Sequence, residues 1–221
     1  MDTTFYFLYA VGYVWLIRRG LTSLQRDQIG SLTSIAYLII IGLALDNVVA
    51  ASGRFIGEGS LLRHLNLICY WLHAFLTPTL VLFSLGVLRS AGVKGMQSKP
   101  ALYGAILLTG ALIGLEVATV TWGMELKPKM ESGVLRYVPA DSSGGSGIMV
   151  MLVTVVLVVA GAILWKKTQW RWMFIGAAAM AVGSLVPIPA HRSTVMNGLE
   201  FVLLTTLVAT KWHQDSQITA N

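Results

Sequence analysis

The sequence predicts an all-α, polytopic integral membrane protein built as one bundle of about seven transmembrane helices. Apolar residues make up 55% of the 221 residues and charged residues only 12%, about half the roughly 25% found in soluble domains. Apolar runs recur along the whole chain, and the charged residues collect between them. Because a helix needs about 20 apolar residues to cross the hydrocarbon, the runs predict one transmembrane domain over residues 1–221.

The predicted spans follow one another with short connections. The first lacks the basic start of a cleavable signal peptide and is followed by Arg18 and Arg19, as suits a first span with its N-terminus outside. Pro78 is expected to kink the third span. Pro100 is expected to begin the fourth, where a missing N–H has no cost. The spans are predicted at residues 3–17, 30–52, 65–88, 101–124, 147–165, 172–188 and 194–210.

Two connecting features stand out. The longest connection, residues 125–146, holds two prolines and a Gly/Ser-rich run from Asp141. Its composition is more typical of a flexible linker than of a lid over a site. In the fourth span, Gly110 and Gly114 form a small-residue pair that permits close helix packing. Pro187 and Pro189 are expected to close the sixth span.

The basic residues predict the orientation. With the N-terminus outside, the inside segments carry ten of them and the outside segments six, which favours a cytoplasmic C-terminus. The formal net charge of +6 is therefore interpreted as a topology signal, and no nucleic-acid partner is expected. The inside group is Arg18, Arg19, Arg26, Arg89, Lys94, Lys99, Lys166, Lys167, Arg171 and Lys211. The outside group is Arg54, Arg63, Lys127, Lys129, Arg136 and Arg192.

Familiar catalytic motifs are absent from the sequence. It contains no P-loop, H-E-x-x-H, C-x-x-C or G-x-S-x-G pattern, which excludes the sites that depend on them. The single cysteine, Cys69, cannot form an intrachain disulfide. No lysine lies in the middle of a predicted span, so a retinal-type Schiff base has no candidate. The identity of any metal or cofactor stays open.

Polar residues within the predicted spans gather in one half of the bilayer. Asp46 and Glu116 fall late in even-numbered spans, whereas His73 and Glu200 fall early in odd-numbered ones. These positions meet on one side, the outer side under the predicted orientation. A charged residue facing lipid costs about 2.5–3.5 kcal/mol, so these side chains are expected to face inward. The expected catalytic residues are Asp46, His73, Glu116 and Glu200. The expected substrate-binding residues are Asn47, Arg54, Asn66, Tyr70, Arg136 and Asn197, with Arg192 as a further head-group ligand.

Carboxylates shielded from water, beside a histidine, can exchange protons or hold a metal ion. Arginines at the mouth of such a site can hold an anionic head group. The favoured function is therefore a membrane-embedded enzyme that acts on a lipid or isoprenoid-like substrate, with membrane lipids and a hydrophobic small molecule as its partners. The competing structural interpretations are that Asp46 and Asn47 only join helices, that His73 binds a carbonyl freed by Pro78, and that the arginines anchor in head groups.

Two other classes stay open. A small-solute or proton-coupled transporter would need polar groups that connect both faces, and a sealed inner half would count against it. A non-catalytic sensor, immunity or assembly protein would use the polar cluster only for helix packing. A haem-binding variant would use His73 and His191, and an absorbance scan would decide it.

Overall fold

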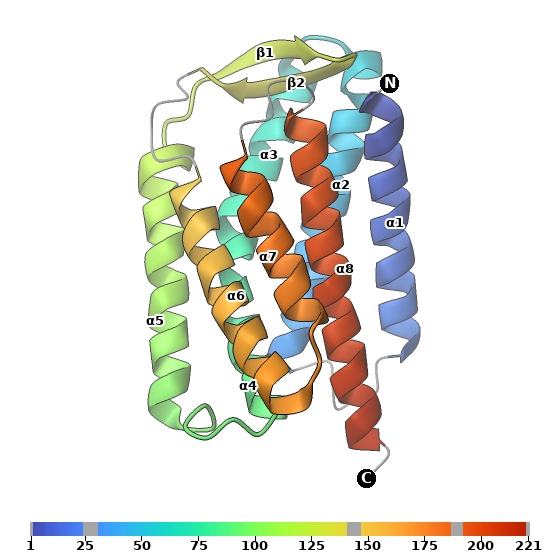
Figure 1. Cartoon of the computed structure of the whole chain (residues 1–221). Helices are drawn as coiled ribbons and strands as arrows, with labels where there is room; N and C mark the ends of the chain where they lie inside the picture. Colours follow the sequence, from blue (N-terminus) through green and yellow to red (C-terminus); the bar gives the residue numbers. More distant parts are fainter. Residues whose placement is uncertain (1, 24–30, 141–146, 187–191, 220–221) are drawn as a thin grey trace.

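The protein is a bundle of helices with a two-stranded hairpin lying across one end (Figure 1). The computed structural model describes residues 2–23, 31–140, 147–186 and 192–219. The N-terminus lies beside the hairpin, and the C-terminus lies at the opposite end (Figure 1). We call these two ends of the bundle the hairpin end and the C-terminal end.

The described helices confirm an all-α protein with several helices suited to a membrane. By length and composition, five helical stretches in the described ranges could cross one: Leu32–Ile56, Ser60–Ser90, Lys99–Thr121, Ile148–Thr168 and Ser193–Gln217.

The other two predicted spans are helical, but a bundle of seven spans is not confirmed. Helix α1 (Asp2–Ser23) is long enough, yet it falls outside the apolar set, and it carries Asp2, Arg18 and Arg19. Helix α7 (Trp172–Leu185) has only 14 residues, which is about 21 Å at 1.5 Å per residue. The prolines expected to close it lie outside the described residues.

A glycine ends α2, and a proline interrupts the helix between α3 and α4. A 3-10 turn, η2 (Leu32–Ser34), leads into α2 (Ile35–Ile56), which ends at Gly57 with a φ of 78°. Only glycine adopts that conformation without strain. Helix α3 (Ser60–Leu76) continues through the 3-10 turn η3 (Thr77–Thr79) into α4 (Leu80–Ser90). The interruption at Pro78 confirms the predicted break in this span.

The later helices begin with local signals. Helix α5 (Lys99–Glu116) has Pro100 in its first turn, and the Ser98 hydroxyl accepts a hydrogen bond from the Ala101 amide at 3.3 Å. It continues into a π-helical turn, η4 (Val117–Thr121). Helix α6 (Ile148–Thr168) precedes α7. Helix α8 (Arg192–Thr219) runs well beyond the predicted end at residue 210.

The hairpin replaces most of the connection that the sequence indicated as irregular. Strands β1 (Leu126–Glu131) and β2 (Val134–Pro139) pair antiparallel, with Glu131 opposite Val134. The turn between them, Ser132 and Gly133, has positive φ at both residues, which matches the right-handed twist of the strands. Residues 141–146 lie outside the described ranges. The two prolines of the connection, at 128 and 139, sit in the hairpin.

The hairpin packs directly on α2 and α3. Leu135 and Tyr137 of β2 share an apolar cluster with Val49, Leu62 and Cys69 of those helices. Gly53 of α2 makes the close approach possible, because a Cβ atom there would overlap the backbone oxygen of Leu135. The strand is therefore seated on the helices without an intervening side chain.

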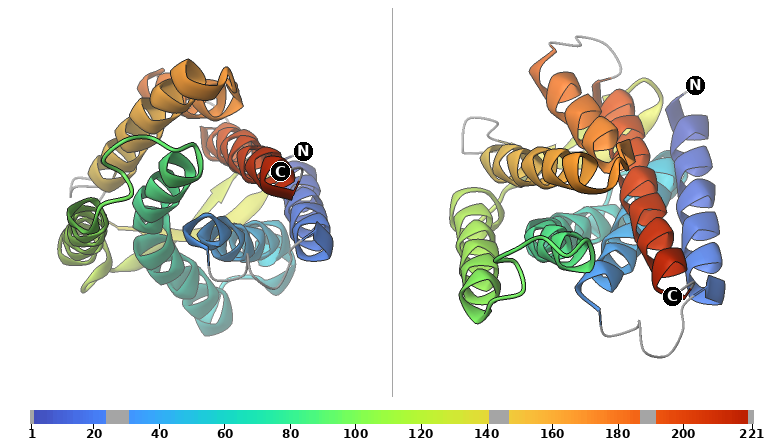
Figure 2. Two further views of the ribbon diagram at one scale, coloured as in Figure 1. Left: turned by 90° about the horizontal axis from the view of Figure 1, so that it is seen from below. Right: turned by 60° about the horizontal axis from the view of Figure 1, so that its bottom comes forward.

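The helices are not equally buried. The main apolar core brings together α1, α2, α4, α6, α7 and α8, and α5 adds a single buried residue to it, Leu112. Helix α5 stands at the edge of the bundle (Figure 2). In the most apolar stretch of Lys99–Thr121, which includes α5, only 17% is buried inside the protein. The matching value for Ser60–Ser90 is 56%. Gly110 and Gly114 have open space where a Cβ would lie, so the predicted small-residue pair packs against none of the described residues.

Candidate functional site

A buried ion pair ties the hairpin to the helices. Nη2 of Arg136 on β2 donates to Oδ1 of Asp46 on α2 at 2.6 Å, and the two side chains are 18% and 19% exposed. Burial by itself would lower the pKa of Arg136, but the Asp46 carboxylate and Tyr6 together raise that pKa above its ordinary value. The guanidinium therefore stays charged, and two predicted site residues distant in sequence lie in contact.

A small cavity in the apolar core holds two further predicted residues. His73 of α3 and Glu200 of α8 both line it, and its volume is about 30 Å³. This central cavity is completed by side chains of α2, α4, α6 and α7, among them Leu43, Thr154 and Met180. A space of that size holds a water molecule, which needs roughly 10–15 Å³.

The two polar groups of the central cavity differ in their partners. Nδ1 of His73 lies 3.2 Å from the Thr77 hydroxyl, so the ring is held by a side chain one turn further along. The Glu200 carboxylate makes no hydrogen bond or ion pair with any residue in the described ranges. Asp46 lies one helical turn after Leu43 on α2. Its carboxylate is close enough to interact electrostatically with both His73 and Glu200.

A second cavity lies under the hairpin. It also measures about 30 Å³, and Arg136 contributes to its wall. We call it the hairpin cavity. Its other lining residues are mostly polar and come from the start of α1, the hairpin and the start of α8: Asp2, Tyr6, Lys129, Glu131, Val134, Val138, Ser193 and Thr194. Arg136 therefore borders the hairpin cavity, and its partner Asp46 lies one turn along α2 from Leu43 of the central cavity.

Three predicted asparagines repeat one arrangement. Asn47, Asn66 and Asn197 are 0%, 0% and 8% exposed. In each, Nδ2 donates to the carbonyl four residues earlier, at 2.8–2.9 Å. Each Oδ1 is buried without a partner among the described residues. An unpaired buried acceptor costs about 1–3 kcal/mol, so these three amides lower the stability of the fold at the hairpin end.

The remaining predicted residues are dispersed. The Tyr70 hydroxyl donates to the Tyr137 carbonyl at 3.4 Å, beneath the hairpin. Glu116 is 8% exposed at the end of α5, and it lines neither cavity. Arg54 is exposed and lies over the Phe55 ring at 5.3 Å. His191 and the side chain of Arg192 lie outside the described residues.

The described residues also bear on metal binding. Within them, no group of three or more His, Cys, Asp or Glu side chains is arranged to hold a metal ion. Three of the four predicted catalytic residues, Asp46, His73 and Glu200, thus lie near one another. Glu116 lies apart from them. Acid–base chemistry needs only two facing groups, which the central cavity supplies.

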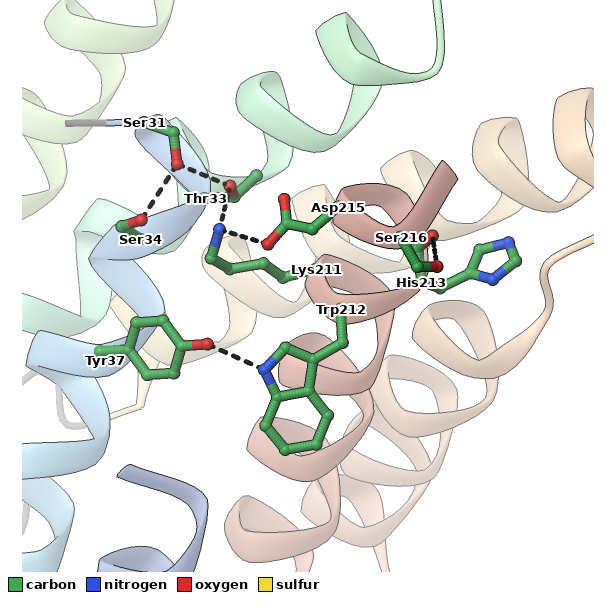
Figure 3. Close-up of polar contacts among 9 residues, drawn as sticks. All are labelled: Ser31, Thr33, Ser34, Tyr37, Lys211, Trp212, His213, Asp215 and Ser216. Atoms are coloured by element: carbon green, nitrogen blue, oxygen red, sulfur yellow. Dashed lines mark hydrogen bonds and ion pairs between the residues drawn. The ribbon is translucent and has the colours of Figure 1, made fainter. Parts of the chain in front are cut away.

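One buried polar group at the C-terminal end is not among the residues predicted from the sequence. Lys211 is 1% exposed, and its Nζ donates to Asp215 at 2.9 Å and to the Thr33 hydroxyl at 3.4 Å (Figure 3). Beside it, Nε1 of Trp212 donates to the Tyr37 hydroxyl at 2.9 Å (Figure 3). Lys211 was expected in a loop because the apolar run ends at Thr210. The four-residue spacing from Lys211 to Asp215 was the available signal that the helix continues.

No protein-family model matches this sequence, and no curated protein is significantly similar to it. The arrangement of the chain's own residues therefore carries the functional proposal.

Proposed function

We propose that this protein is a multi-pass membrane enzyme that acts on a lipid or isoprenoid-like substrate, with His73 and Glu200 as its acid–base pair. The observation that carries the proposal is that these two groups, from different helices, face one water-sized cavity inside the apolar core. Glu200 is only partly exposed and has no partner among the described residues. A carboxylate at that depth has a substantial cost, which function can justify.

The chemistry follows from the two side chains. One group takes a proton from the substrate or from a cavity water while the other returns one. Because Thr77 lies at Nδ1 of His73, the opposite ring nitrogen, Nε2, is the one available for proton exchange. Thr77 thereby orients the imidazole, and Asp46 acts as a positioning residue through its charge.

The substrate class follows from where the cavity lies. Apolar side chains such as Leu43, Val153 and Leu203 make most of its wall, and its volume of about 30 Å³ admits only a small reacting group or a water molecule. The rest of the substrate must therefore lie along the apolar helices outside the cavity. A lipid or an isoprenoid chain meets that requirement. Arg136, in the wall of the hairpin cavity, would face its head group.

The proposed topology places the hairpin end outside and the C-terminus in the cytoplasm, with α1 and α7 completing seven spans. Arg89, Lys99, Lys166 and Lys167 stand at helix ends opposite the hairpin, which agrees with a cytoplasmic excess of positive charge. The exposed Trp122 beside the hairpin suits an interfacial position.

The packing below the central cavity favours an enzyme over a transporter. Phe83, Leu207 and Val208 are each 0% exposed between that cavity and the C-terminal end. Lys211 and its partners then cover the end itself. A carrier needs polar groups that reach both faces, whereas an enzyme supplied from one side does not.

The test is turnover in lipid nanodiscs. The purified protein is incubated with labelled glycerophospholipids and isoprenoid phosphates, and products are identified by mass spectrometry. Glu200→Gln and His73→Ala should each lower the rate by about 10²–10⁴-fold, the usual contribution of a general acid or base. Glu58→Gln is the matched control, because Glu58 is an exposed carboxylate in the turn after α2.

Two results would overturn the proposal. One is a wild-type protein that converts none of these lipids. The other is a folded Glu200→Gln or His73→Ala variant with the wild-type rate. In the second case, a loss of stability without a loss of turnover would favour a purely structural polar cluster.

A further inference from the structure

Few polar contacts tie the hairpin to the helices in the described part of the chain. The Arg136–Asp46 pair is the only salt bridge among them. The others are single hydrogen bonds: the Thr3 hydroxyl to the Gly133 carbonyl at 3.1 Å, the Gly59 amide to the Tyr137 hydroxyl at 3.1 Å, and the Tyr70 hydroxyl to the Tyr137 carbonyl at 3.4 Å. The Tyr6 side chain of α1 also contacts Arg136. The ion pair is thus the strongest directional contact that seats β2.

The ion pair borders one water-sized space and lies near the wall of a second. Arg136 forms part of the wall of the hairpin cavity. Asp46 follows Leu43, a wall residue of the central cavity, by one helical turn. Moving β2 away from α2 would remove Arg136 from this position and would leave Asp46 open to the hairpin cavity. Water could then reach the level of His73 and Glu200.

We infer that the hairpin is a lid over a water route to the central cavity, and that the Arg136–Asp46 pair is its latch. The pair is stable when closed because each charge compensates the other in a poorly hydrated place. When the hairpin lifts, water compensates both charges instead, so the open form is accessible. The purpose of the route rests on the proposed acid–base role of His73 and Glu200, but its existence does not.

The chain carries its own reporter of lid opening. Cys69 is its single cysteine, and it is 6% exposed in the cluster with Leu135 and Tyr137 of the hairpin. When the lid is closed, β2 covers the thiol. Opening should therefore expose Cys69 to a bulky, charged maleimide added to the full-length protein in nanodiscs.

Two variants should open the lid by independent means. Arg136→Gln removes the latch and keeps the Asp46 carboxylate beside Cys69, whereas Gly53→Ala pushes Leu135 away while leaving the ion pair chemically intact. Each should raise the labelling rate of Cys69 at least about tenfold, as loss of one substantial interaction does to an opening equilibrium. Arg63→Gln, an exposed arginine at the same end, and Gly104→Ala, which has open space around it, are the matched controls.

The route to the central cavity needs a reporter of its own. In a Cys69→Ser chain, Thr154→Cys places a thiol in the wall of the central cavity. Adding Arg136→Gln should speed its labelling. In the same background, Val208→Cys, buried toward the C-terminal end, should stay protected. Its protection distinguishes lid opening from general unfolding.

The lid is excluded if Cys69 labels at the wild-type rate in both Arg136→Gln and Gly53→Ala. The route is excluded if Cys69 becomes reactive while Thr154→Cys does not, or if Val208→Cys becomes equally reactive. Labelling requires no substrate, so its outcome is independent of the turnover test. A lid without turnover overturns only the enzyme proposal, and turnover without a lid overturns only this inference.

Discussion

The two ends of the bundle each hold a buried ion pair, but the pairs are built differently. At the C-terminal end, Lys211 and Asp215 lie one turn apart on the same helix, and the Thr33 hydroxyl supplies a further partner. At the hairpin end, Asp46 and Arg136 come from a helix and a strand that the fold must bring together. The first pair forms as soon as α8 forms, whereas the second exists only when the hairpin is seated.

The surroundings of the two pairs differ as well. Near Lys211, the unpaired buried polar atom in the described residues is Oε1 of Gln214. Toward the hairpin end, there are five: the Oδ1 atoms of the three asparagines, Nε of Arg136, and the hydroxyl of Tyr13, which lies near both Asp46 and Glu200. Each unpaired atom lowers stability. The C-terminal end is therefore a well-paired structural joint, whereas the hairpin end keeps more buried polar atoms that have no partner among the described residues.

The largest expected effect comes from breaking the joint at the C-terminal end. Asp215→Ala leaves the ammonium of Lys211 buried without its counter-charge, which should lower the free energy of unfolding by about 3–5 kcal/mol. Denaturant titration of the purified protein in mixed micelles measures the loss.

The matched control replaces both partners. Lys211→Met combined with Asp215→Leu removes the charges and keeps the volume, and such replacements are often neutral or stabilising. A double variant as unstable as Asp215→Ala would contradict the view that the uncompensated charge causes the loss.

A smaller effect of opposite sign is expected at the hairpin end. Asn66→Leu removes a fully buried amide whose Oδ1 is unpaired. Stability should hold or rise by up to about 1–3 kcal/mol, the cost of an unsatisfied acceptor. Thermal unfolding measured by intrinsic tryptophan fluorescence tests this. A fall in stability would mean that the amide oxygen has an essential partner, and the contrast between the two ends would disappear.

The smallest effects concern glycines and extend the contrast to the edge of the bundle. In Gly86→Ala, the new Cβ would lie 2.8 Å from Leu32 and 3.1 Å from the Thr33 amide, at the C-terminal end. The clash should cost about 1–3 kcal/mol. Gly110→Ala on α5 meets open space and should change stability by less than about 1 kcal/mol. A larger loss in Gly110→Ala, measured in the same unfolding assay, would reveal a contact outside the chain.

Composition and apolar runs were sufficient to predict the helices, because burial in hydrocarbon constrains every residue of a span. The helix break at Pro78 and the helix start at Pro100 were also predictable, because both follow from the local chemistry of proline. The hairpin did not, because its exposed strand β1 carries Lys127, Pro128 and Lys129, which are poor strand formers. Its pairing depends on the turn at Ser132 and Gly133 and on the close fit over Gly53.

The candidate site was predictable only to the level of one end of the bundle. Helix direction placed Asp46, His73 and Glu200 at similar depth, and the structure brings these three near one another. The same reasoning placed Glu116 with them, but α5 stands at the edge and carries it elsewhere. Depth follows from counting residues, whereas lateral position depends on which helices pack together. Lys211 was missed because an apolar run ends before its helix does.

The short α7 has a consequence for the surrounding lipid. At about 21 Å, it is roughly 9 Å shorter than a typical hydrocarbon layer of about 30 Å. In the proposed topology, the bilayer must thin beside α7 or let head groups sink toward its ends. Met180 of α7 also lines the central cavity, so the thinned flank adjoins the cavity that contains His73 and Glu200. The bilayer itself would then shorten the path of a lipid head group to the reacting side chains.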